Sequence, residues 1–360
     1  MMRNGKQIPV LLALLCLLLP GCAETATDEA AFGDFSGETL YARTATDEEA
    51  FGLAKERAGE SAETISQEDS QDQTPLEEET VTLEDEEAVP LAASPMLLPV
   101  AGGTAVESGG GAEIDYSNIS DGYVMVRHAG ANSKRLRVQV VGPNTTYTYD
   151  LPTGGWSTFP LSDGNGSYKV MALQNTEGKK YAKLASVTFQ VALTDEFAPF
   201  LRPNQYVDYG AAPNTVGKAA ELTAGSSDGL DKVAKVYDFV VGNLTYDEKK
   251  AATVKSGYLP VLDTVLSTKT GICFDYAALM TGMLRSQGVP CKLVVGYAGK
   301  QYHAWVSVWT EKTGWVDNII YFDGSTWQRM DPTFASSGKS SASIMQYIGD
   351  GKNYTVKYLY

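Results

Sequence analysis

Residues 271–277, Gly-Ile-Cys-Phe-Asp-Tyr-Ala, begin the strongest helical pattern in the sequence and decide how the C-terminal half folds. The helix predicted at 274–287 is stopped by Gly288 and Pro290. A glycine-bearing loop therefore delivers Cys273 to the first turn of a helix. There the unpaired backbone N–H groups and the helix dipole favour a thiolate and can bind an oxyanion. Cys273 is accordingly our candidate nucleophile.

A nucleophilic cysteine needs a base, and the base needs an acceptor that orients it. His303 is the only histidine after residue 128, and it begins an alternating strand at 303–309. Asp331 follows a strand predicted at 327–330. If these strands lie close in one sheet, His303 and Asp331 line one edge and face the helix that carries Cys273. The sequence thus predicts a Cys-His-Asp triad.

The pattern around these residues indicates two folded regions. From about residue 195, helices predicted at 230–240, 261–266 and 274–287 precede strands at 291–297, 304–309, 318–322 and 327–330, which favours an α+β fold. Residues 112–194 instead alternate in short strands separated by Gly, Asn and Asp turns. Strands at such a spacing predict an all-β, immunoglobulin-like sandwich.

Five short motifs carry a resemblance to a known family. They are GICFDYA at 271–277, GVP at 288–290, VGY at 295–297, HAW at 303–305 and DPT at 331–333. In this order, within about residues 200–337, they resemble the transglutaminase-like superfamily, whose fold is similar to that of papain. The resemblance implies Cys273 as nucleophile, His303 as general base and acid, and Asp331 as the residue that orients the imidazole. Residues 312–326 insert a hairpin between the histidine strand and the aspartate, which leaves the substrate open.

The implied chemistry is attack of the Cys273 thiolate on an amide carbonyl, with an acyl-enzyme as intermediate. Water as acceptor makes the enzyme a protease or amidase, and a lysine amine makes it a crosslinking transglutaminase. We favour hydrolysis of a protein or peptide, because crosslinking also requires a site that admits an amine while limiting water. A non-catalytic surface binding or scaffold protein is the alternative from another class.

Other interpretations of the same side chains remain open. Cys291 opens an apolar strand and is most simply a small buried residue. A Cys273–Cys291 disulfide is a further possibility, and it would block the nucleophile. One histidine and no Cys-x-x-Cys spacing build no zinc site of known type, so we expect neither a metal nor another cofactor. Asp275 suits the helix dipole but disfavours a nearby thiolate by its charge, and we interpret it as structural.

The N-terminus has the pattern of an export signal at residues 1–21. Arg3 and Lys6 precede an apolar run at 8–19 that is short for a transmembrane helix. Gly21 and Cys22 then resemble a bacterial lipoprotein processing box, which implies lipidation at Cys22. The chain would be anchored to the outer face of the bacterial cell membrane. A plain secretory signal is the alternative.

The net charge of −15 is concentrated in one segment. Residues 22–90 hold 21 Asp and Glu against three basic residues, so the rest of the chain is near neutral and offers no basic surface for nucleic acid. Such a segment cannot bury enough apolar surface to fold. We predict a disordered acidic tether and linker at 22–111, the sandwich at 112–194 and the transglutaminase-like domain at 195–360. The expected partners are a protein or peptide substrate, the membrane and the cell wall.

Overall fold

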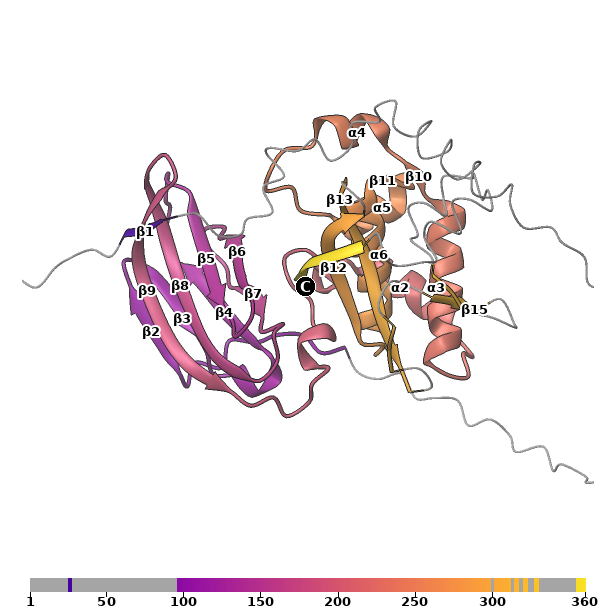
Figure 1. Ribbon diagram of the computed structural model, residues 1–360, viewed down its shortest axis with the longest axis horizontal. Helices are drawn as coiled ribbons and strands as arrows, with labels where there is room; N and C mark the ends of the chain where they lie inside the picture. The colour runs from indigo at the N-terminus through magenta and orange to yellow at the C-terminus, as the bar shows by residue number, and fades with distance from the viewer. Residues whose placement is uncertain are drawn as a thin grey trace, which may run out of the picture.

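The computed structural model describes residues 25–27, 96–298, 301–311, 314–316, 320–322, 327–329 and 354–360 (Figure 1). The predicted signal, Cys22 and nearly all of the acidic tether lie outside the described residues. Within them, no helix is long and apolar enough to cross a membrane. The remainder is a strand-rich region followed by a mixed α+β domain, as the sequence predicts.

The strand-rich region consists of two antiparallel sheets (Figure 1). One sheet has the order β2 (Val106–Gly109), β3 (Ala112–Asp115), β4 (Tyr123–His128), β7 (Ser157–Pro160). The other has the order β1 (Thr25–Thr27), β9 (Lys180–Val191), β8 (Gly166–Glu177), β5 (Leu136–Val141), β6 (Thr146–Asp150). From β2 onward, the chain changes sheet after β4, after β6 and after β7. This alternation is that of an immunoglobulin-like sandwich.

The sandwich begins earlier than we predicted. Strand β2 lies inside the segment that we expected to be linker up to residue 111, and that part of the prediction is wrong. The reason is the role of Gly110 and Gly111, whose φ angles of 55° and 83° make the tight turn between β2 and β3. These glycines are turn residues of a hairpin, and sequence composition alone does not separate them from linker glycines.

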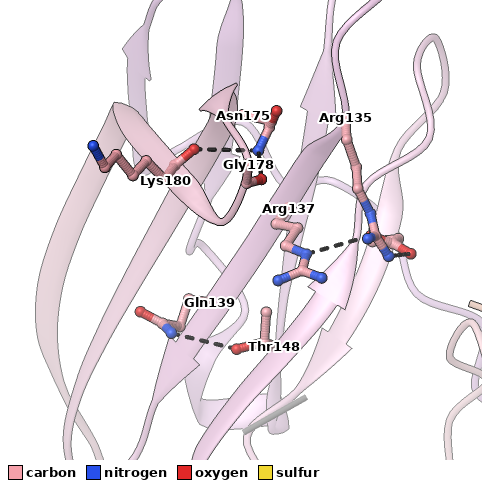
Figure 2. A network of polar contacts seen from close by, with 8 residues as sticks. Arg135, Arg137, Gln139, Thr148, Asn175, Gly178 and Lys180 are labelled. Carbon is pink, nitrogen blue, oxygen red and sulfur yellow. Dashed lines mark hydrogen bonds and ion pairs between the residues drawn. The ribbon is translucent and has the colours of Figure 1, made fainter. Parts of the chain in front are cut away.

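Alternation along β5 gives the second sheet a buried and a polar face. Val138 and Val140 are fully buried in the core, whereas Arg137 and Gln139 point to the other side of the sheet. Figure 2 shows this polar side, where Gln139 Nε2 donates to Thr148 Oγ1 at 3.3 Å. Arg135 and Arg137 lie side by side there. Arg135 also makes a bidentate ion pair with Asp150, in which Nε donates to Oδ1 at 2.8 Å and Nη2 to Oδ2 at 2.7 Å.

The second domain begins with helices. They are α2 (Pro213–Thr223), α3 (Gly229–Asn243), α4 (Glu248–Thr253), α5 (Leu262–Thr268) and α6 (Cys273–Ser286). The start of α3 is set by Asp228, whose side chain accepts a hydrogen bond from the amide of Asp231. Helix α6 is buried along its whole length and packs against α2, α3 and α5. The predicted helices at 230–240, 261–266 and 274–287 correspond to α3, α5 and α6, while α2 and α4 were not predicted.

A sheet follows the helices, with the order β14, β13, β12, β17. Its strands are β12 (Cys291–Ala298), β13 (Gln301–Thr310), β14 (Gly314–Val316) and β17 (Tyr354–Leu359), all antiparallel. Strands β15 (Ile320–Phe322) and β16 (Trp327–Arg329) correspond to the strands predicted at 318–322 and 327–330, and they pair with one another. Two short strands, β10 (Thr245–Tyr246) and β11 (Thr270–Gly271), pair in parallel just before α6.

Tyrosines join the two regions. Tyr147 and Tyr149 of β6 contact Tyr360, with ring centroids 5.8 Å apart in both pairs. Tyr206 lies against Tyr360 at 4.5 Å and against Tyr149 at 5.8 Å. These side chains belong to a single cluster of buried residues that runs from the sandwich core to α6. The C-terminal residues 354–360 therefore contribute both to the sheet of the second domain and to the junction with the first.

Candidate active site

Cys273 is the first residue of α6, as predicted, and only 1% of it is exposed. The preceding Ile272 is extended, with φ −96° and ψ 174°, and its carbonyl oxygen accepts from the amide of Tyr276 at 3.1 Å. The loop before it is held by main-chain bonds from Thr245 to Lys269 and from Asp247 to Gly271, both at 2.9 Å. The start of α6 is thus fixed by β10 and by the beginning of α4.

The two cysteines of the described domain differ in environment. Both are free thiols, so the disulfide that we considered is not formed. Burial raises the pKa of Cys291 to about 12, because the charged form loses its hydration. Its Sγ lies 3.7 Å from Thr281 Oγ1 in the contact between β12 and α6. Cys291 is therefore a neutral packing residue, and Cys273 remains the candidate nucleophile.

His303 lies on β13, opposite Gly296 of β12, and is 5% exposed. Its ring is stacked at 6.4 Å from that of Trp305. Helix α6 and β13 pack against each other, so the elements that carry Cys273 and His303 are neighbours. Asp331 lies outside the described residues, and its role stays a prediction.

Alternation along β13 gives a more specific result. Strands β12 and β13 pair without a register shift, and Cys291, on the face that contacts α6, lies opposite Val308. Counting back by twos places Ala304 and Tyr302 on this same face, and His303 with Trp305 on the other. The described structure thus brings the two elements together without placing the imidazole on the face of Cys273. The pairing of Sγ with the imidazole stays a prediction.

Tyr302 lies on the face of β13 that packs on α6. Burial raises the pKa of Tyr302, and nearby groups, Cys273 among them, add to this effect. Its ring is in edge contact with Tyr297 at 5.4 Å. Tyr302 is not among the site residues that the sequence predicts, although its position one residue before His303 on an alternating strand was available as a signal.

Asp275 has a more specific environment than the sequence suggests. Its side chain is fully buried, and Oδ2 accepts from the amide of Ile272 at 2.8 Å and from Lys250 Nζ at 2.6 Å. The hydroxyl of Tyr258 donates to Oδ1 at 2.5 Å. Gly271 allows this close approach, because a Cβ there would lie 2.6 Å from Asp275 Cβ. The carboxylate is therefore bound to both the start of α6 and helix α4.

The comparisons with known proteins agree with this description. Residues 217–332 match the family model of the transglutaminase-like superfamily, a span that includes Cys273, His303 and Asp331. The chain therefore contains a domain of the transglutaminase-like superfamily.

Two curated relatives share part of the chain. YebA of Bacillus subtilis (strain 168) is 29% identical over 117 residues, which is 27% of this chain and 16% of that protein. The protein-glutamine gamma-glutamyltransferase of Pseudomonas aeruginosa is 33% identical over 85 residues, or 20% of this chain and 12% of that protein. The chain thus spans less than a fifth of the length of either relative.

Among solved structures, a proposed cysteine protease from Cytophaga hutchinsonii matches with a TM-score of 0.34 and 16% identity, covering 66% of this chain and 83% of that one.

Proposed function

We propose that this protein is a cysteine-dependent enzyme that attacks amide carbonyls, with Cys273 as nucleophile, His303 as base and Asp331 as the residue that orients His303. The single observation that carries the proposal is the position of Cys273. It is a free thiol at the first residue of a buried helix, within a domain of the transglutaminase-like superfamily. The amide groups of that first turn are suited to bind the oxyanion that forms on the substrate.

The reaction that we favour is hydrolysis. The Cys273 thiolate adds to the carbonyl carbon, the amine leaves with a proton from His303, and the acyl group stays on sulfur. Water deprotonated by His303 then adds to the acyl carbon, the acid is released, and the Cys273 thiolate and protonated His303 are restored. These reaction steps balance in protons and electrons without a metal ion or cofactor. The substrate would be a protein or peptide.

Acyl transfer to a lysine amine is the second candidate. It is favoured by one observation, the 33% identity to a protein-glutamine gamma-glutamyltransferase over 85 residues. The first half-reaction is the same, and only the acceptor of the acyl group differs.

The deciding experiment incubates the full chain with a mixture of proteins and a labelled primary amine. New N-termini support hydrolysis, and covalent label on the protein mixture supports transfer. Both signals should vanish in Cys273→Ala and persist in Cys291→Ala, the matched control. Absence of both products with the unmodified chain, or their persistence in Cys273→Ala, contradicts the enzymatic proposal. A surface binding or scaffold protein is then the remaining candidate.

We also propose that the protein is exported and anchored through a lipid at Cys22. The proposal rests on the basic start, the apolar run and the Gly21–Cys22 pair of the sequence. Expression in bacteria fed a labelled fatty acid should give a labelled membrane-bound chain, and Cys22→Ala should abolish the label. Label retained in Cys22→Ala, or an unlabelled wild-type chain, would refute it. If Cys22→Ala abolishes the label as we expect, the membrane and the cell wall beside it are partners of the tether.

A further inference from the structure

Two residues after the candidate nucleophile, Asp275 forms an ion pair with Lys250 that the proposed mechanism does not use. Asp275 is 0% exposed, while the Lys250 side chain that binds it is 28% exposed. Lys250 Nζ also lies 2.6 Å from the hydroxyl of Tyr258 and 4.3 Å from the centre of its ring. The three side chains come from α6, from α4 and from the loop between α4 and α5.

The charge of Asp275 matters to Cys273 because the two residues share the first turn of α6. The carboxylate folds back to the amide of Ile272, so its negative charge lies at the start of the helix. An isolated carboxylate there would disfavour a second negative charge on Sγ and offset the stabilisation that the helix dipole gives to a thiolate. A cation in direct contact cancels most of this field. Lys250 supplies that cation at 2.6 Å.

Hydrogen bonds at the start of α4 fix the position of Lys250. Asp247 caps α4 by accepting from the amide of Lys250 at 2.8 Å, and its own amide donates to Gly271. Helix α4 is therefore attached to the loop that delivers Cys273. Lys250 reaches the carboxylate from the first turn of this six-residue helix. A salt bridge used only for stability would not require a fully buried acid, since desolvation offsets much of its Coulomb energy.

Other titratable groups near this start are mostly neutral. They are Tyr302 on β13, Tyr358 on β17, Tyr206, Tyr258, and the capping Asp247 and exposed Lys269 in the adjoining loops. His303, the proposed base, lies on the opposite face of β13. Burial raises the pKa of Tyr358 to about 12, and it raises those of Tyr206, Tyr258 and Tyr302 as well. These phenols are uncharged at neutral pH. Among the described residues, Asp275 and Lys250 are thus the charged pair bound to the start of α6.

We propose that Lys250 is a positioning residue for the reaction: it neutralises Asp275 and so allows the first turn of α6 to hold Cys273 as a thiolate. This inference rests on the proposed function. It assigns Asp275 the separate role of fixing the helix start, and Lys250 the role of removing the electrostatic penalty.

The test measures the rate at which iodoacetamide alkylates Cys273 in the full chain as a function of pH, with the labelled peptide read by mass spectrometry. In Lys250→Met the midpoint of this profile should move up by about one pH unit, or roughly a tenfold slower reaction at neutral pH. Lys250→Arg should keep the wild-type midpoint. Lys249→Met, an exposed lysine of the same helix, is the matched control and should also leave it unchanged.

The double variant Lys250→Met/Asp275→Asn separates charge from structure. Removing both charges should return the midpoint to the wild-type value even if the protein is less stable. The inference is overturned if Lys250→Met slows alkylation equally at all pH values with an unmoved midpoint, or if the double variant stays displaced. Failure of the proposed function looks different: alkylation of the unmodified chain would be slow and unaffected by His303→Ala.

Discussion

At the scale of single residues, the environment of each thiol decides its chemistry. Cys273 stands at a helix start, whereas Cys291 lies in the packed contact between β12 and α6. The position of Cys273 could be predicted from sequence because helix starts and stops are local signals. The partner of Asp275 could not, because Lys250 is 25 residues away in a six-residue helix that has no apolar period of its own.

Cys291 makes a pH-dependent contribution to stability. Burial raises its pKa from 9.0 to about 12, so the folded protein holds a proton that the unfolded chain releases above pH 9. The stabilising contribution is therefore complete below pH 9 and is lost as the pH rises toward 12. We expect the fall in melting temperature between pH 8 and pH 10.5 to be smaller in Cys291→Ala than in the wild type. Equal falls in the two proteins would show that this thiol does not titrate in the unfolding reaction.

At the scale of elements, the predicted helices and strands correspond to the described ones wherever periodicity is strong. Helix α6 and strands β12 and β13 were predicted within one to three residues. The pairing of strands was harder, because it depends on contacts between distant segments. We expected the strand before Asp331 to lie close to that of His303, yet among the described residues β16 pairs with β15.

Gly296 shows how tightly β12 and β17 approach. A Cβ at this position would lie 2.0 Å from the carbonyl oxygen of Thr355 and 2.9 Å from the Trp305 ring. Gly296→Ala should therefore lower the free energy of unfolding by about 1–3 kcal/mol, as overpacking does elsewhere. Chemical denaturation measures this directly.

Gly217 provides the matched control for that substitution. It is an exposed residue of helix α2, and a Cβ there would have no atom within 4 Å. Gly217→Ala should stabilise the protein by about 0.5–1 kcal/mol, because alanine loses less backbone entropy in a helix. If both substitutions had the same small effect, the close approach of β12 and β17 would be disproved.

At the scale of the whole molecule, the sandwich and the second domain share a core through their tyrosines. This junction was not predicted, because aromatic residues in alternating strands look alike whether they face a domain core or a neighbouring domain. Tyr149 is central to it, since its ring contacts Phe159, Tyr206 and Tyr360.

The shared core predicts cooperative unfolding. Calorimetry of the full chain should show one main unfolding transition. Tyr149→Ala should lower the free energy of unfolding by about 3 kcal/mol or more, because it leaves a cavity. Two well-separated transitions, only one of them shifted by Tyr149→Ala, would mean that the regions are energetically independent.

The central claim is that Cys273 is a nucleophile activated by His303. It is tested most directly by the rate of iodoacetamide labelling of Cys273 at neutral pH in the full chain. We predict fast labelling that slows on the order of tenfold or more in His303→Ala. His128→Ala, which removes the other histidine from strand β4, should leave the rate unchanged. Slow labelling that is indifferent to His303→Ala would contradict the account.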